Sequence, residues 1–506
     1  MRKLTVLCLT GLFILAFGIA SAQDKLEFKA SGSMDAQTQW GKNTPYANAA
    51  APIYGNIPAA NQYGGSQYNR TVAYLEARTR LKFDAVMSKS LSGTLLFEFD
   101  AEPWGNPPGG NTGKISDRGA FGYWGGDRAA LEVKNIYIDW GVPSIPVPVS
   151  VRVGLQTLAI RPNLFLLTDG MAVNTSVNLD PVSLQMFWAK AVEGKYEAAD
   201  DSDVYGIHAK AKVGTMSVGG YGVYYNMNSF PLWNPAPTAG TQRSDMFWFG
   251  VYADGKAGPV DLNFDFIYDW GWVKRPGFQV YPKVKYSGWE TRIKISFPWE
   301  MFDVGAIGMY ATGADRYKTS GSGTAGSATA IGTESTKVAS FVVPPASEAS
   351  GAFGEAVVLL GSWVNRGNTG WGTTYNYSSM TRGPAGGLWF GKLYAAVKPT
   401  PWYKATFQVL YVGDTTKHGN TFGTAWKYPV AFGGLGIRRD DKEVGWEFDL
   451  IHEIQIYKNL KYNIGMGYVF AGKGMEFGYT DPVSGFLVNN KPKNPWNVLT
   501  SLVYTF

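Results

Sequence analysis

The segment Asn497-Val-Leu-Thr-Ser-Leu-Val-Tyr-Thr-Phe506 decides the fold that we expect for this chain. Successive side chains of a β-strand point to opposite faces. One face of this segment therefore carries Val498, Thr500, Leu502, Tyr504 and Phe506, and the other carries Leu499, Ser501, Val503 and Thr505. The pattern predicts a strand with an apolar outer face that ends in aromatic side chains.

This strand resembles the closing strand of bacterial outer-membrane β-barrels, where a terminal phenylalanine is part of the assembly signal. The resemblance implies that Tyr504 and Phe506 carry that signal here. It also implies that the chain is a porin of the bacterial outer membrane, in contact with its lipids.

Upstream segments show the same alternation, which is typical of membrane barrels. In 259–270, for example, polar side chains at 261, 263, 265 and 269 alternate with apolar and aromatic ones at 262, 264, 266, 268 and 270. The alternative is a soluble β-sandwich, whose apolar faces form the core. The apolar faces are too rich in Trp, Tyr and Phe for that, and the segments are too many. Eighteen segments alternate: 26–40, 71–87, 91–103, 129–140, 149–158, 171–179, 182–193, 203–213, 215–226, 244–255, 259–272, 284–297, 302–313, 386–398, 402–413, 441–456, 460–471 and 496–506.

The connections between these segments alternate in length. Short turns are expected at 88–90, 180–181, 214–215, 258–259, 298–300, 399–401 and 458–459, and long connections at 41–70, 104–128, 227–243, 273–283, 314–385, 414–440 and 472–495. Bacterial barrels have short periplasmic turns and long extracellular loops. We therefore predict an all-β fold: a transmembrane antiparallel up-and-down β-barrel of about 18 strands, with 16 to 20 inside the error of the boundaries.

The first 22 residues predict a secretory signal peptide. Met1-Arg-Lys3 is a charged start, an apolar run follows to Ile19, and Ala20-Ser-Ala22 is a small-residue cleavage site. The barrel is then expected over 23–506. The only cysteine, Cys8, lies in the signal segment, so a disulfide framework and haem attachment are not expected.

The composition limits the functions that we expect. The chain carries 15% aromatic and 17% charged residues and 62 glycines, and no run after residue 22 is long and apolar enough for a spanning helix. A formal charge of +6, or +4 without Arg2 and Lys3, argues neither for nor against a nucleic-acid partner. The expected location in the outer membrane argues against one. The spacing of the three histidines matches no catalytic motif. The glycines of Gly465-Met-Gly467 lie on an expected strand, where small residues permit close packing. The sequence predicts no enzyme activity, cofactor or metal.

Charges on the inward phase are the candidate pore-lining residues. The basic set is Arg78, Arg80, Lys82, Arg152, Arg161, Lys210 and Lys212, and the acidic set is Asp261, Asp265, Glu447 and Asp449. Because the two sets lie on different strands, we expect a basic wall that faces a largely acidic wall across the lumen.

Two connections are candidates for a constriction. The segment 154–170 resembles the inward-folded constriction loop of porins, and its Gly-x-Gln start loosely resembles the eighteen-stranded barrels of the alginate-export type. The connection 314–385 is unusually long, which favours a functional role. It is expected to cover the mouth, to fold inward as a partial plug, or to hold a short helix.

These features predict a water-filled channel for passive diffusion of small hydrophilic solutes and ions. Three alternatives remain open: a dedicated channel for one charged solute or polymer, a structural or adhesion barrel with a filled lumen, and a barrel that sheathes a larger envelope complex. The resemblance to porins implies a homotrimer.

Overall fold

A computed structural model describes residues 25–43, 71–104, 122, 131–193, 201–230, 242–274, 283–313, 337–345, 347, 355–360, 387–417, 425, 439–480 and 487–506. The expected signal peptide, 1–22, lies outside these residues.

Among the described residues, one 19-stranded sheet contains the two-residue strand β14 (Lys337–Val338) and eighteen longer strands that form a barrel wall. The wall strands are β1 (Glu27–Lys42), β2 (Thr71–Ser88), β3 (Leu91–Pro103), β4 (Glu132–Gly141), β5 (Val149–Ile160), β6 (Leu166–Leu179), β7 (Val182–Val192), β8 (Ser202–Val213), β9 (Met216–Phe230), β10 (Gln242–Ala257), β11 (Val260–Lys274), β12 (Lys283–Trp299), β13 (Phe302–Ala311), β15 (Leu388–Thr400), β16 (Tyr403–Asp414), β17 (Glu443–Tyr457), β18 (Leu460–Ala471) and β21 (Trp496–Thr505). A separate hairpin joins β19 (Phe477–Thr480) to β20 (Leu487–Asn490). Each of the eighteen predicted segments corresponds to one wall strand.

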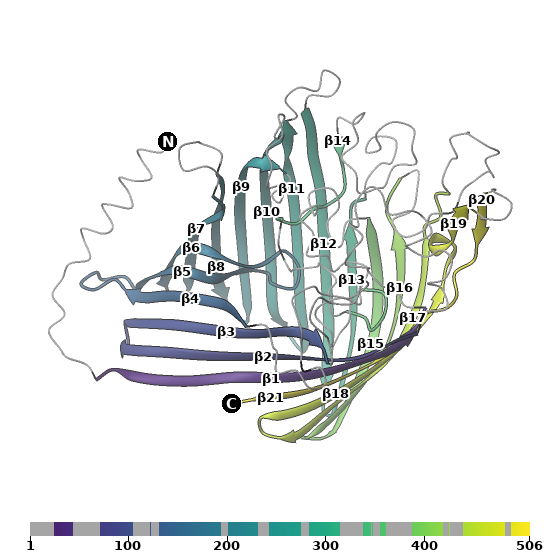
Figure 1. Ribbon diagram of the computed structural model, residues 1–506, viewed down its shortest axis with the longest axis horizontal. Coiled ribbons are helices and arrows are strands. Elements are labelled where there is room, and N and C mark those ends of the chain that lie inside the picture. The colour runs from purple at the N-terminus through teal and green to yellow at the C-terminus, as the bar shows by residue number, and fades with distance from the viewer. Residues whose placement is uncertain are drawn as a thin grey trace.

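The barrel is closed by its first and last strands. β1 pairs with β2 on one side and with β21 on the other, and β21 pairs in turn with β18. The β1–β21 register runs antiparallel from Ser33 opposite Thr505 to Lys42 opposite Trp496. Figure 1 shows β1 and β21 side by side at the lower edge. The predicted all-β, antiparallel barrel is confirmed.

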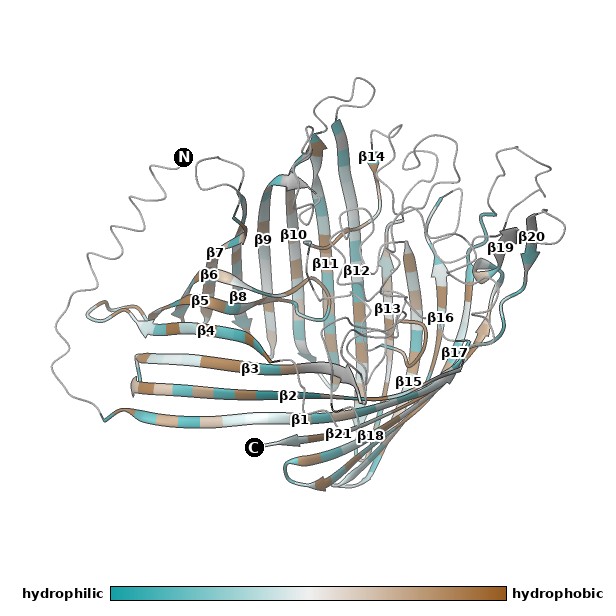
Figure 2. Cartoon of the chain, in the orientation of Figure 1, coloured by the Kyte–Doolittle hydropathy of each residue, from teal (hydrophilic) through white to brown (hydrophobic). Residues whose placement is uncertain are grey.

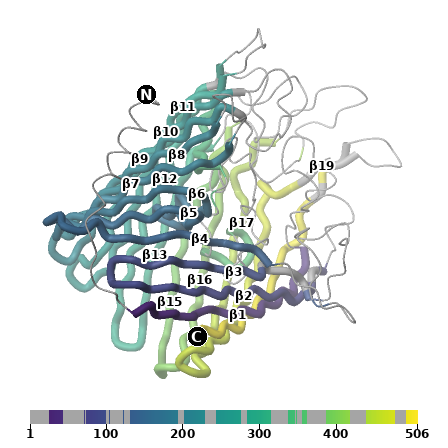
Figure 3. Tube along the Cα trace, turned by 60° about the vertical axis from the view of Figure 1, so that its left-hand side comes forward, coloured from purple at the N-terminus to yellow at the C-terminus, as the bar shows by residue number. Residues whose placement is uncertain are grey.

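The short connections also follow the prediction. Seven hairpins have turns of two residues, and Figure 3 shows such turns along one rim of the barrel. Gly214 and Gly258 open two of them with φ of +60° and +64°, a backbone conformation that glycine adopts without strain.

The two faces of the wall differ in chemistry. Figure 2 shows hydrophilic and hydrophobic residues alternating along strands such as β2. The exposed large apolar side chains on the outer phase include Phe28, Met34, Phe83, Ile136, Ile138, Ile207, Phe249, Val251, Ile293, Ile295, Leu393, Phe407, Phe448, Leu450 and Leu502. The inner phase carries polar and charged side chains. Because closure leaves no unpaired strand edge, such a wall can stand in a lipid bilayer.

No helix among the described residues has the length and apolar character to cross a membrane.

The described parts of the long connection lie inside the barrel. We call residues 337–345, 347 and 355–360 the inner loop. β14 pairs in parallel with β12 at Lys285 and Tyr286, beyond the last β13 partner of β12. Phe341, Val342, Val343 and 356–360 then join the buried apolar cluster within the barrel. Of the three arrangements expected for this connection, the described residues take the inward one.

The closing strand provides a first testable prediction. The backbone N–H of Phe506 donates to Gly32 O at 3.1 Å, its ring stacks on Tyr504 at 5.6 Å, and the side chain is 46% exposed on the outer face. We expect Phe506→Asp to reduce the yield of heat-modifiable barrel in the outer membrane, measured by electrophoresis with and without boiling. A charge near the interface costs less than the roughly 2–4 kcal/mol of the bilayer centre, so lost recognition during assembly is the larger effect. Normal yield from this variant, with Phe506→Tyr as the control, would contradict the assigned role.

Candidate functional site

The tip of the β5–β6 hairpin packs against strands β9 to β11 of the wall. The predicted constriction segment 154–170 consists of the ends of β5 and β6 and a five-residue turn, so the boundaries expected for it were wrong. Phe165 in this turn is fully buried, stacks on Tyr221 of β9 at 4.9 Å and lies 6.2 Å from the ring of Trp248 of β10. The hairpin therefore narrows the lumen from one side.

Arg161 anchors this tip. Its guanidinium binds Asp254 of β10 at 2.5 Å and Asp265 of β11 at 2.5 Å, and it lies 4.4 Å above the ring of Tyr252. Burial alone would lower the pKa of Arg161, but hydrogen bonds and charges from Asp265 and Asp254 raise it above its ordinary value. The arginine therefore remains charged. The expectation that Arg161 and Asp265 stand on opposing walls is wrong, because the turn carries Arg161 across to β11.

The first part of the inner loop is held by β10, β11 and the end of β13. The backbone N–H of Val342 donates to Asp269 Oδ2 at 3.0 Å, and Trp248 Nε1 donates to Val342 O at 2.8 Å. Phe341 N donates to Thr312 O at 2.9 Å. These bonds satisfy backbone groups that the loop buries inside the barrel.

The second part of the inner loop is held by β17. Glu447 Oε1 accepts the N–H groups of Val357 at 2.9 Å and Val358 at 2.6 Å, and its Oε2 accepts that of Leu359 at 2.7 Å. Asp449 accepts Val357 N at 3.3 Å. Both carboxylates face inward as predicted, but the inner loop covers them, with 0% and 1% exposure. Their expected role as lining of an open pore therefore needs correction, since loop backbone and not water contacts them.

Glu355 fixes the inner loop to two cations of the wall. Its carboxylate pairs with Arg292 of β12 and with Lys392 of β15, the latter at 2.6 Å. Lys392 Nζ and Gln408 Nε2 also donate to Glu355 O at 2.8 and 3.0 Å. Burial alone would raise the pKa of Glu355, but the charges of Lys392 and Arg292 hold it below its usual range. Glu355 is therefore ionised at neutral pH.

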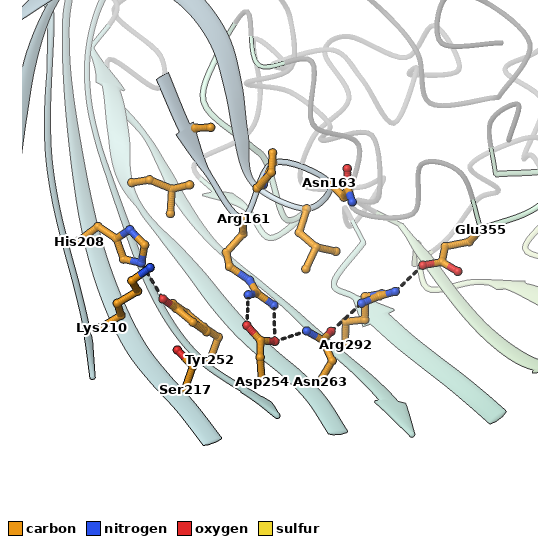
Figure 4. A pocket seen from close by; sticks show the side chains of 14 residues that line it. Arg161, Asn163, His208, Lys210, Ser217, Tyr252, Asp254, Asn263, Arg292 and Glu355 are labelled. Atoms are coloured by element: carbon orange, nitrogen blue, oxygen red, sulfur yellow. Dashed lines mark hydrogen bonds and ion pairs between the residues drawn. The ribbon is translucent and has the colours of Figure 1, made fainter. Parts of the chain in front are cut away.

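A chain of polar contacts joins the two constricting pieces. Figure 4 shows it running from Arg161 through Asp254, Asn263 and Arg292 to Glu355. Ser347 adds a direct contact, since its hydroxyl donates to Phe165 O at 2.9 Å. The hairpin tip and the inner loop thus form one connected constriction.

A cavity of about 490 Å³ lies beside this chain of contacts, below the hairpin tip. Its lining includes Lys210 and also His208, whose Nε2 lies 2.8 Å from Tyr252 Oη. Neither Lys210 nor Lys212 forms an ion pair with another described residue, and both are exposed. Lys210 therefore presents an uncompensated positive charge to this cavity.

The remaining predicted basic residues lie on β2 and β5 beside acidic partners. Arg80 pairs with Glu98, on which the charge of Arg78 also acts. Lys82 pairs with Asp84 at 2.9 Å, and Arg152 pairs with Asp139 at 2.7 Å. The side chain of Asp261 is 43% exposed, with Lys256 at 3.9 Å. Charges of both signs therefore alternate around the lumen, and the expected segregation into a basic and an acidic wall is replaced by local pairs.

The sequence reasoning missed Arg292, Lys392 and Glu355. Arg292 and Lys392 stand on the inward phase of their strands, so their lumen position was available from the alternation. No local signal marked Glu355, because its partners lie 63 and 37 residues away. Among the described residues no group of histidine, cysteine and acidic side chains is arranged to hold a metal ion.

No protein-family model and no curated protein matches this chain. Similar solved structures include OccK8 (OprE) of Pseudomonas aeruginosa, with 10% identity, a TM-score of 0.47 and coverage of 95% of this chain and 98% of that one. OpdK of the same organism, solved with vanillate, has 8% identity, a TM-score of 0.47 and coverage of 94% and 98%. A BenF-like porin from Pseudomonas fluorescens Pf-5 has 8% identity, a TM-score of 0.47 and coverage of 95% and 98%.

Proposed function

We propose that this protein is a channel of the bacterial outer membrane through which small hydrophilic solutes and ions diffuse passively. It works without a cofactor, and the inner loop with the β5–β6 hairpin forms its narrowest part.

The half-exposed ion pairs on the inward face of β2 to β5 carry this proposal. The side chains of Lys82, Arg152 and Asp139 are 39%, 36% and 33% exposed although they point into the barrel. Charged side chains with this much exposed surface must contact water, because removing a charge from water costs several kcal/mol per ion. Lipid on the outer face cannot supply that water, so the lumen along these strands is the expected solute path.

The constriction supports a small size limit for solutes. The inner loop binds strands from β10 to β17, whereas the exposed pairs lie on β2 to β5. A passing solute therefore meets charged side chains on one side and the apolar, closely packed loop on the other. Such a path favours small polar molecules over bulky or apolar ones.

The test is the conductance of the purified protein in planar bilayers, combined with swelling of liposomes in neutral sugars of increasing size. We expect stepwise, ohmic conductance and swelling that falls steeply with solute size. A protein that inserts as a heat-modifiable barrel but neither conducts nor permits swelling would refute the channel.

A dedicated channel for one charged solute is the second candidate, and the cavity beside Lys210 favours it. A cavity of about 490 Å³ lined by one uncompensated cation suits a small anion. A dedicated channel would show saturable flux for its solute, whereas passive diffusion rises linearly with concentration. Uptake measured over a range of concentrations separates the two.

The basic side chains of β2 and β5 provide a prediction about ion selectivity. We expect replacement of Arg78, Arg80 and Arg152 by glutamine to shift permeability towards cations, because Asp139 then loses Arg152 and Glu98 keeps only Lys134. Screening extends over roughly 8–10 Å at moderate ionic strength, so the shift of reversal potential should be largest at low salt. The three Arg→Lys replacements are the control and should keep the parental value. An unchanged reversal potential in the glutamine variant would remove these residues from the solute path.

The assembly that we propose is a homotrimer, as in porins generally. The mass of the protein in detergent under native conditions tests it, and a monomeric mass would exclude it.

A further inference from the structure

Four carboxylates on the inward faces of β11, β12 and β17 lie beneath the inner loop. Asp269, Glu290, Glu447 and Asp449 are at most 1% exposed. None of them forms an ion pair with a described lysine or arginine. They differ in this from the other lumen carboxylates, such as Asp84, Asp139 and Glu453, which have cationic partners.

Backbone N–H groups take the place of cations at three of the four. Asp269 accepts the N–H of Gly288 and of Val342, each at 3.0 Å. Glu447 accepts three successive N–H groups of the inner loop, and Asp449 accepts one. Consecutive N–H groups carry positive partial charge and form a binding site for an anion. The loop backbone therefore compensates charges of the wall.

Glu290 is the unsatisfied member. Both of its carboxylate oxygens are buried and without a hydrogen-bond partner, and it stands on the strand phase of Gly288, which the backbone of Phe341 covers. A buried carboxylate in this state is costly, and water or a cation relieves the cost. Because Glu290 is only 1% exposed, neither water nor a cation reaches it in this arrangement.

From these contacts we infer that the inner loop masks a cation-attracting wall of the lumen and so sets the ion selectivity of the pore. When the loop is docked, its N–H groups bind Asp269, Glu447 and Asp449, and the four carboxylates stay buried. When it is displaced, the same four carboxylates face water together with Arg292 and Lys392, and the excess of negative charge attracts cations. This inference rests on the proposed channel function.

The physical reason is the geometry of a narrow, low-dielectric lumen. Clustered charges of one sign raise the local concentration of the opposite ion, with surface potentials of several kT. Rings of acidic side chains select cations in the same way. Losing the loop therefore changes two properties together, since the pore becomes wider and its selectivity moves towards cations.

The experiment replaces residues 337–360 by a short Gly-Ser linker. This deletion also removes Glu355, so Arg292→Gln and Lys392→Gln are included to leave no cation without its carboxylate partner. The full-length chain with Glu355→Gln, Arg292→Gln and Lys392→Gln is the matched control. A further variant adds Asp269→Asn, Glu290→Gln, Glu447→Gln and Asp449→Asn to the deletion. Conductance and reversal potential are measured for all in a potassium chloride gradient.

We expect the deletion variant to conduct more and to show a several-fold rise in cation over anion permeability relative to the control. The four amides should restore the selectivity of the control while the high conductance remains. A wider pore with unchanged selectivity, or a cation preference that survives the four amides, would overturn the inference. Absence of conductance in the parental protein would instead refute the channel function.

If the deletion variant fails to form a heat-modifiable barrel, Gly288→Val with Gly467→Val serves in its place. This pair displaces the loop by side-chain bulk and keeps every charge. It should move the reversal potential in the same direction, and an unchanged value together with raised conductance would again overturn the inference.

Discussion

Gly288→Val combined with Gly467→Val is expected to raise the single-channel conductance several-fold, because the inner loop then loses its close packing against the wall at both positions. A Cβ at Gly288 would lie 2.6 Å from the backbone of Phe341. One at Gly467 would lie 2.6 Å from Asp449 Oδ1 and 2.8 Å from Val357 Cβ. Overpacking of this kind costs about 1–3 kcal/mol at each site. Four wall strands lie between the two sites, so the costs should add to roughly 2–6 kcal/mol against the docked loop.

Valine itself is compatible with a β-strand, so the wall should remain intact. The control is Gly391→Val on the outer face of β15, where an added Cβ meets no atom within 4 Å. Thiol labelling of Val358→Cys in the same background reports undocking directly, since Cys8 is the only natural cysteine. Parental conductance together with a protected Cys at 358 would show that docking of the loop does not depend on the two glycines.

The second large effect is expected from Glu355→Gln. This change leaves Arg292 and Lys392, whose side chains are 13% and 6% exposed, without a negative partner. Removing one partner of a buried ion pair costs about 3–5 kcal/mol. We expect the inner loop to undock at neutral pH, with higher conductance and faster labelling of Cys at 358.

The same residue predicts a dependence on pH. The pKa of Glu355 is lowered in the folded protein. The stabilisation that its ion pairs give to the docked loop is therefore complete at neutral pH and is lost as the pH falls through that lowered value. Acidification of the parental protein should therefore approach the behaviour of Glu355→Gln. Glu453→Gln on β17 is the control, because Glu453 pairs with Lys404 and Lys461 and has no bond to the inner loop. A Glu355→Gln protein with a protected Cys at 358 at neutral pH would exclude the ion pair as the anchor.

The sequence by itself determined the wall of this protein. Strand number, the face on which each residue lies and the position of the tight turns depend on local features: the period of two and residues such as Gly214 and Gly258. Arg78, Lys210 and Glu447 could be assigned to the inward face for that reason. The number of alternating segments also equals the number of wall strands. Each wall strand must cross the same thickness of membrane, so each one leaves an alternating segment of similar length in the sequence.

Only the tertiary structure decided what those inward residues contact. Arg161 meets Asp265 because the β5–β6 turn folds across the lumen, and Glu447 meets the backbone of 357–359 because the inner loop descends inside the barrel. These partners are separated by 104 and about 90 residues, and the path of a connection between them leaves no periodic mark in the sequence. A residue's face follows from its own strand, whereas its charge environment depends on loops folded from elsewhere in the chain.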